Sequence, residues 1–198
     1  MLRSTVDQPV ISVASSKDRD RVIATMVMGF SSDPLTRWFW PEASGYLQSG
    51  AAFDAFGGNA IAAGTAFVTT GFEGAALWLP PGTDPDEERM AEFIESSVSP
   101  KIVSDVLAVF EKMDEYHPDE EVWYLPLIAV DPAHQGKGIG SALMKEALRH
   151  CDNDGFPAYL ESSNLRNVSL YERHGFETIG QIQVGNSPVV TPMYRAAR

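Results

Sequence analysis

The stretch that most constrains the fold is a nine-residue apolar run, VWYLPLIAV, at residues 122–130. A strand that is apolar on both sides has to be covered on both faces, so the run predicts a central strand with helices on each face of its sheet. Pro126 lies inside this run. Because proline has no N–H to give to a neighbouring strand, it predicts a bulge or a splayed pairing in mid-strand.

A glycine-rich turn follows this strand, and a helix is expected from Gly138 to about Asp152. A helix start offers unpaired N–H groups and the positive end of the helix dipole, so this order of elements predicts an anion site. Two common phosphate loops fit poorly. The dinucleotide-binding pattern G-x-G-x-x-G does not match the strictly alternating Gly136, Gly138 and Gly140. In a P-loop the lysine precedes Ser or Thr, whereas Lys137 precedes a glycine.

The remaining segments predict a mixed α+β fold and a single domain over residues 1–198. Helical spacing of apolar residues predicts helices at 15–30, 33–41 (a short helix or turn), 46–56 and 164–174, and two pieces between 86 and 116 with a break near Ser99-Pro100. Strand-like runs bounded by turn residues occupy 10–13, 59–70, 75–79, 157–162, 176–184 and 189–195.

Charge and cysteine content exclude several classes of function. The formal net charge of -12 disfavours nucleic acid and anionic membranes as partners. The acidic residues mark either a solvated surface or a field that attracts cationic substrates. A lone cysteine, Cys151, excludes an internal disulfide framework and a Cys-rich zinc site, so no metal is expected. The absence of an apolar leader and of any eighteen-residue apolar run predicts a soluble, cytoplasmic protein.

The glycine turn resembles a signature of one enzyme family. Gln135-Gly136-Lys137-Gly138-Ile139-Gly140 is similar to the (Arg/Gln)-x-x-Gly-x-(Gly/Ala) element of the Gcn5-related N-acetyltransferases (GNAT), and the string NLRNVSLYERHGF follows at the family's usual distance. Residues 117–143 and 155–176 are similar to the branch that includes puromycin N-acetyltransferase. The resemblance implies a mostly antiparallel sheet of about seven strands, with a splayed parallel pair formed by the fourth and fifth strands.

The same resemblance implies acetyl-CoA as cosubstrate and assigns residues to it. The pantetheine arm would pair with the strand at Ile128, Ala129 and Val130, as an added strand does. Asn164 matches a pantetheine-contacting asparagine and is equally suited to cap a helix; the two roles are compatible. Asn167 receives no ligand role. The pyrophosphate would lie over Gln135, Gly136, Lys137, Gly138, Ile139, Gly140 and Ser141.

Proton transfer needs an acid and a base, and only the acid has a clear match. Tyr171 matches the family's tyrosine beside the coenzyme sulfur, and as a phenol it is available as a proton donor at neutral pH. The strand glutamate of histone-acetylating relatives falls at Tyr124, so that base is absent. Glu161 is the first candidate base and His117 the second. Glu120 and Glu121 are further candidates that would act through a water relay.

The sequence leaves the acceptor open. In this family, specificity comes largely from the first helices and the loop before the fourth strand. Here these regions contain Arg37 and the aromatic residues Trp38, Phe39, Trp40 and Trp78, which either line an acceptor site or fill the core. The first hypothesis is acetyl transfer to a primary amine of a small molecule, by direct attack in a ternary complex. The alternatives are acetylation of a protein or peptide, and a catalytically silent acyl-CoA sensor. Homodimers are frequent in the family, so a homodimer is a further expectation.

Overall fold

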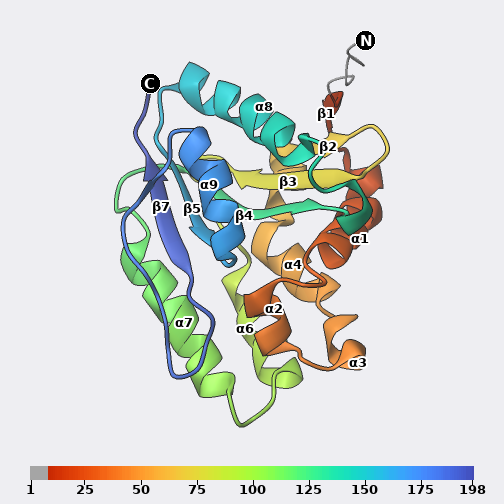
Figure 1. Cartoon of the computed structure of the whole chain (residues 1–198), viewed down its shortest axis with the longest axis vertical. Helices are drawn as coiled ribbons and strands as arrows, with labels where there is room; N and C mark the ends of the chain where they lie inside the picture. Colours follow the sequence, from red (N-terminus) through yellow and green to blue (C-terminus); the bar gives the residue numbers. More distant parts are fainter. Residues whose placement is uncertain (1–8) are drawn as a thin grey trace, which may run out of the picture.

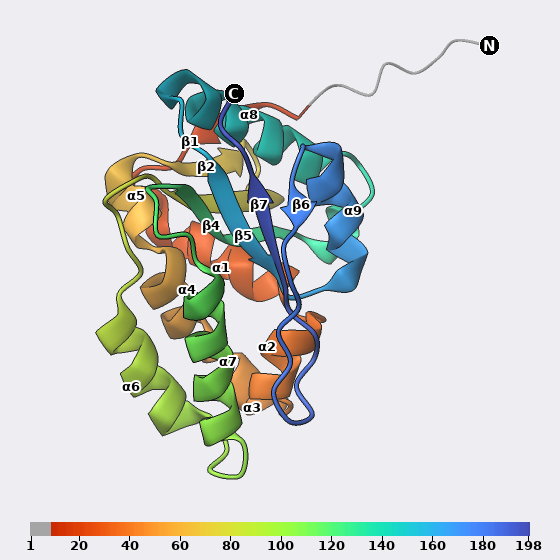
Figure 2. The same cartoon turned by 90° about the vertical axis from the view of Figure 1, so that its left-hand side faces the viewer.

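The computed structural model describes residues 9–198, and within them a seven-stranded sheet has the order β1-β2-β3-β4-β5-β7-β6 (Figures 1 and 2). Every neighbouring pair is antiparallel except β4 and β5, which run parallel. This confirms the expected fold class and the parallel pair. The strands are β1 (Ile11–Val13), β2 (Ala66–Thr69), β3 (Gly74–Leu79), β4 (Trp123–Val130), β5 (Ala158–Ser162), β6 (Glu177–Thr178) and β7 (Thr191–Arg195).

Helices cover both faces of this sheet, as the apolar run of β4 requires. α8 packs against β2, β3 and β4 on one face, and α1 packs against β3 and β4 on the other. Figures 1 and 2 show α2, α3, α6 and α7 gathered at the end of the molecule away from α8. The helices are α1 (Arg19–Gly29), α2 (Pro34–Phe39), α3 (Ala43–Tyr46), α4 (Gly50–Gly57), α5 (Asn59–Ala63), α6 (Glu87–Ser97), α7 (Val103–Tyr116), α8 (Ile139–Asp154) and α9 (Leu165–Arg173).

Pro126 marks the point where β4 and β5 part. β4 pairs with β5 only over residues 123–125, and its register with β3 shifts between Leu77 and Leu79. Trp123 and Leu125 pack into the core under α8, whereas Leu127 and Ala129 pack into the core on the α1 side. One additional residue therefore sits in the strand, which confirms the irregularity expected at the proline.

Three expected elements have different bounds. The expected strand 59–70 begins as α5, because alanine-rich residues favour a helix, and Gly64 ends it with a left-handed φ of 73°. The expected helix 46–56 divides into α3 and α4. The expected strand 176–184 keeps only β6 and an isolated bridge between Ile182 and Val190. None of the helices in the described residues is long and apolar enough to cross a membrane.

Candidate functional site

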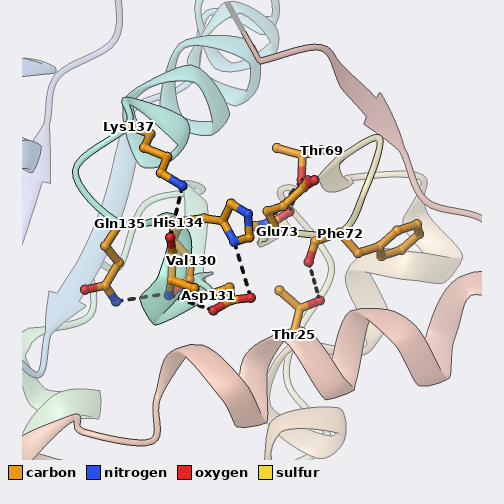
Figure 3. Close-up of polar contacts among 11 residues, drawn as sticks. Thr25, Thr69, Phe72, Glu73, Val130, Asp131, His134, Gln135 and Lys137 are labelled. Carbon is orange, nitrogen blue, oxygen red and sulfur yellow. Dashed lines mark hydrogen bonds and ion pairs between the residues drawn. The ribbon is translucent and has the colours of Figure 1, made fainter.

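The turn after β4 is shaped by its own polar groups (Figure 3). The Asp131 carboxylate accepts a hydrogen bond from the N–H of Ala133 at 2.8 Å and lies 3.3 Å from Nδ1 of His134. The amide of Gln135 donates to the carbonyl of Val130 at 3.2 Å, and the Lys137 ammonium donates to the carbonyl of Ala133 at 3.0 Å. These contacts hold the turn in a fixed shape at the start of α8.

Two glycines leave room above this turn. Gly136 and Gly138 have φ values of 75° and 83°, and a Cβ at either position would meet no heavy atom of the described residues within 4 Å. Gly138 precedes α8 and provides no side-chain cap, so the first-turn N–H groups, beginning at Ile139, have no partner within the helix. Open space in front of unpaired N–H groups fits a diphosphate, the group that the sequence resemblance places here.

The far end of this turn is tied to α9. The hydroxyl of Ser141 lies 3.0 Å from Nε2 of His174, in a hydrogen bond between the start of α8 and the end of α9. Gly140 lies against Leu170, since a Cβ at that glycine would come within 3.4 Å of it. The turn and α9 therefore form one connected surface.

Beyond Pro126, β4 has an open edge on the side of β5. The N–H of Asp131 donates to the carbonyl of Glu73 at 2.8 Å, which fixes the direction of the peptide groups along the strand. Because these directions alternate, the peptide groups of Ile128 and the N–H of Val130 face away from β3. β5 has already ceased to pair at this level, so these groups are available to a ligand.

Ala129 has a different orientation from its two neighbours. Its peptide groups face β3 by the same alternation. Its methyl group packs against α1 at Gly29, where a Cβ would come within 2.6 Å of that methyl. Ala129 offers the open edge no hydrogen-bonding group, and its assignment as a coenzyme contact stays a prediction.

Tyr171 and Glu161 line one small cavity, which we call the inner chamber. It has a volume of about 90 Å³ and lies at the open edge of β4, where Pro126 and Ile128 also line it. Tyr171 is 5% exposed. Burial, and secondarily the negative charge of Asp33, raises the pKa of its phenol above the usual value of 10.0, so the group remains protonated.

Glu161 also lines a second, wider cavity of about 680 Å³ on the α7 side, which we call the acidic cleft. Burial raises the pKa of the Glu161 carboxyl from 4.5 to about 7, against the opposing effect of the hydroxyls of Tyr124 and Tyr159. Among the described residues the buried hydroxyl of Tyr159 has no hydrogen-bond partner within 3.5 Å, so its interaction with the Glu161 carboxylate is a longer one. Glu161 can therefore exchange a proton near neutral pH.

His117, the other candidate base, lies at the end of α7 and lines the acidic cleft but not the inner chamber. Its ring meets Tyr124 and Tyr159 edge-on, with centroids 5.2 and 5.0 Å away, and its Nδ1 lies 3.2 Å from the carbonyl of Pro118. The structure thus brings Glu161 together with Tyr171 in the chamber and with His117 in the cleft. Glu120 and Glu121 line the cleft as well.

Residues around the start of α9 refine the sequence interpretation. Asn164 caps the helix, accepting from the N–H of Arg166 at 3.1 Å. Asn167, to which the sequence assigned no ligand role, lines the inner chamber. The signal for it was its place one helical turn before Tyr171, which puts both residues on one face of α9.

Asp33 is a residue that the sequence analysis missed. It is 6% exposed and accepts hydrogen bonds from the N–H and hydroxyl of Thr36, at 2.9 and 3.0 Å, and from the hydroxyl of Ser163 at 2.6 Å. It joins the start of α2 to the turn between β5 and α9, and so holds two walls of the inner chamber together. An Asp-Pro helix start was legible in the sequence, but the contact with Ser163 was not.

The aromatic residues split between the two expected roles. Phe39 and Trp40 line the inner chamber. Trp78 is fully buried in the core under α8. Trp38 donates from its indole N–H to Asn186 at 3.2 Å, and Arg37 donates to the carbonyl of Pro41.

Comparisons with known proteins identify relatives of this chain. The model of the acetyltransferase (GNAT) family matches residues 27–176. An uncharacterized N-acetyltransferase of Schizosaccharomyces pombe is 27% identical over 176 residues, which cover 81% of this chain and 71% of that protein.

Two solved structures share the fold of this chain. A Corynebacterium glutamicum protein described as histone acetyltransferase HPA2 and related acetyltransferase has a TM-score of 0.68 at 22% identity, over 96% of this chain and 97% of its own. The polyamine N-acetyltransferase of Drosophila melanogaster, which forms N-acetylagmatine, has a TM-score of 0.66 at 16% identity, over 96% and 100%.

Proposed function

This chain belongs to the acetyltransferase (GNAT) family, and we propose that it transfers the acetyl group of acetyl-CoA to a primary amine of a small molecule, by direct attack in a ternary complex. One observation carries the proposal. A carboxylate that can exchange a proton near neutral pH and a protonated phenol, Glu161 and Tyr171, line one small chamber at the open edge of β4.

The coenzyme would be held by backbone groups. The first-turn N–H groups of α8, beneath the open space at Gly136 and Gly138, would bind the pyrophosphate. The carbonyl of Ile128 and the N–H of Val130 would pair with the pantetheine amides as an added strand does. When bound, acetyl-CoA supplies a thioester carbon that an uncharged amine can attack, with the thiol as leaving group.

The acceptor amine needs a base, since an alkylammonium of pKa about 10 leaves roughly one molecule in a thousand uncharged at neutral pH. Glu161 would take one proton from the ammonium group. The N–H of Ile128 would donate a hydrogen bond to the carbonyl oxygen of the thioester, on which negative charge develops during the attack. Tyr171 would give its phenolic proton to the departing sulfur. The second proton lost by the nitrogen restores the phenol, so one proton leaves to solvent for each amide formed.

Several finer expectations belong to the proposal. Like the Drosophila polyamine acetyltransferase, which shares its fold, the protein would act on a small amine. A single domain over residues 1–198, membership of the puromycin N-acetyltransferase branch, a cytoplasmic location and a homodimeric state remain predictions from the sequence.

Thiol release from acetyl-CoA, measured across a panel of primary amines and a panel of peptides, tests the function. We expect turnover with compact amines, and calorimetry should detect binding of coenzyme A in their absence. Turnover confined to peptides would move the protein to the protein-acetylating class. Coenzyme binding without turnover of any acceptor would favour the silent acyl-CoA sensor.

A further inference from the structure

The acidic cleft has an unbalanced set of charges. Among the described residues that line it there are eight carboxylates and no lysine or arginine. Within residues 9–198, none of the eight lies within 4.0 Å of a cationic side chain in an ion pair, although Glu120 accepts a hydrogen bond from Tyr194 at 2.8 Å. The carboxylates are those of Asp84, Glu87, Glu111, Asp114, Asp119, Glu120, Glu121 and Glu161.

A buried polar group without a partner lies at the inner end of this cleft. Tyr124 is 8% exposed and lines the cleft. Burial, and secondarily the neighbouring Glu161 carboxylate, raises the pKa of the Tyr124 phenol above its usual value. The hydroxyl of Tyr159, also beside Glu161, is fully buried and has no hydrogen-bond partner within 3.5 Å in the part of the chain that the structure describes. Buried polar groups are normally paired, so this set fits a ligand rich in N–H donors.

Apolar side chains continue from the cleft into the inner chamber. Phe56, Met90 and Phe110 line both cavities, as does Glu161. Phe56 and Phe110 meet edge-on, with ring centroids 6.1 Å apart. An occupant that extends from the chamber into the cleft would thus lay a carbon chain along aromatic and thioether groups, with carboxylates beyond it.

The acids are distributed along the cleft rather than gathered at one point. They come from the turn between β3 and α6, from the first residue of α6, from α7, from the segment before β4 and, in the case of Glu161, from β5. In the described residues, no three His, Cys, Asp or Glu side chains are grouped so that they could hold a metal ion. This spread suits an extended organic cation.

We propose that the acidic cleft binds the acceptor, and that the acceptor is a small organic polycation with at least one positive charge besides the amine that is acetylated. The proposal rests on the proposed function, since it places the reacting amine at Glu161 in the inner chamber. The remote ammonium or guanidinium group lies among the carboxylates of α7 and of residues 119–121. Unpaired carboxylates in a cleft also concentrate cations and raise their rate of association.

Two acceptors of equal length that differ by one charge test the inference: 1,4-diaminobutane and 1-aminobutane. With thiol release as the readout, we expect kcat/KM to be at least about tenfold higher for the diamine, and this ratio to fall as NaCl rises from about 0.05 M to about 0.5 M. Equal values for the two amines at low salt would overturn the inference, while turnover of both would leave the proposed function standing.

A pair of variants separates the cleft from general surface charge. Glu111 and Asp114 lie three residues apart on α7, are exposed and line the cleft. The double variant E111Q/D114N should raise KM for the diamine about fivefold or more, and by a smaller factor for the monoamine, which has no second charge to place among these carboxylates. The control E95Q removes an exposed carboxylate of α6 outside the cleft and should change neither substrate. A diamine KM that is the same in E111Q/D114N and the wild type would overturn the proposal.

A binding measurement keeps the inference testable if no amine is acetylated. Calorimetry of the same two amines against the protein saturated with coenzyme A should show tighter binding of the diamine, weakened in E111Q/D114N and not in E95Q. That result with no turnover would retain the cleft as a cation site and remove the proposed function. Equal binding of the two amines would overturn the cleft assignment whatever the activity.

Discussion

The two ends of β4 are built in contrasting ways. Beyond its last residue, Val130, the candidate coenzyme site comes mainly from one short stretch of chain, 128–141, and uses backbone N–H groups and the dipole of α8. Near its first residue, Trp123, the acidic cleft collects side chains from α6, α7, β5 and two loops. One end is a positive surface made by backbone, and the other a negative surface made by side chains. A short motif therefore identifies the first, while the second depends on the folded chain.

The largest effect is expected from Gly138→Glu, which changes only the candidate coenzyme site at the end of β4. A glutamate there has to adopt a left-handed φ and puts a negative charge into the space for phosphate. We expect binding of coenzyme A to fall by about 1,000-fold or more, measured by calorimetry.

Gly138→Ala is the matched control for this variant. It carries only the cost of the left-handed backbone, about 1–2 kcal/mol, and should still bind coenzyme A. Binding by Gly138→Glu that equals the wild type would show that the two ends of β4 do not divide the ligands in this way.

Tyr171→Phe should have the next largest effect. It changes the inner chamber, which lies between the candidate coenzyme site and the acidic cleft. Removing the phenolic proton should lower kcat by about 100- to 10,000-fold and leave coenzyme affinity within about twofold, because the ring still fills its buried position. Single-turnover kinetics beside calorimetry separate the two quantities. An unchanged kcat would remove Tyr171 from the proton-transfer step.

Glu161→Gln should lower kcat/KM by about 100-fold and change its pH dependence. Glu161 must be ionised to accept a proton, and burial raises its pKa to about 7. In the wild type kcat/KM should therefore fall about tenfold for each pH unit below about 7 and level off above it. This decrease of kcat/KM below pH 7 should be absent in the variant. If it persists there, another group, with His117 the first to examine, is the base.

Protein stability provides the control for Glu161→Gln. The Glu161 carboxyl has a higher pKa in the folded protein, about 7, than the 4.5 of the unfolded chain. As pH rises from 4.5 to about 7, the unfolded chain releases this proton first, so the free energy of unfolding of the protein decreases over this range. An amide has no such ionisation. The variant should unfold at pH 8 at the same temperature as the wild type or a higher one, so lost activity would not reflect unfolding.

Asp33→Ala should have the smallest effect and bears on the acceptor side. It removes the cap of α2 and the partner of Ser163, and should lower the free energy of unfolding by about 1–2 kcal/mol in denaturant titrations. Asp33→Asn keeps a capping oxygen and should lose less. Equal stability of Asp33→Ala and the wild type would show that this contact does not support the chamber.

The limits of sequence interpretation follow the same division. β4, its turn and α8 were predicted because their information is local: an apolar run, a proline, alternating glycines and a helical repeat. Asn59–Ala63 was mistaken for strand because short alanine-rich runs carry no distinct period. The contact between Asp33 and Ser163 joins residues 130 positions apart, and the acidic cleft draws on segments from residue 56 to residue 161. No local pattern predicts the contact between Asp33 and Ser163. For the cleft, the sequence did indicate clusters of acidic residues, with a field that attracts cationic substrates as one interpretation, but it did not show that these clusters meet in one cavity.

The Pro126 bulge has a consequence for evolution at this site. Leu125 and Leu127 already point to opposite faces of the sheet. Deleting the proline would therefore leave all the remaining side chains of β4 on their present faces and restore an ordinary strand. Such a strand could continue hydrogen bonding to β5 and close the edge at Ile128. A single deletion would then produce a more regular sheet without the open edge at which we propose that the cosubstrate binds, so selection for stability alone would work against the residue that opens this edge.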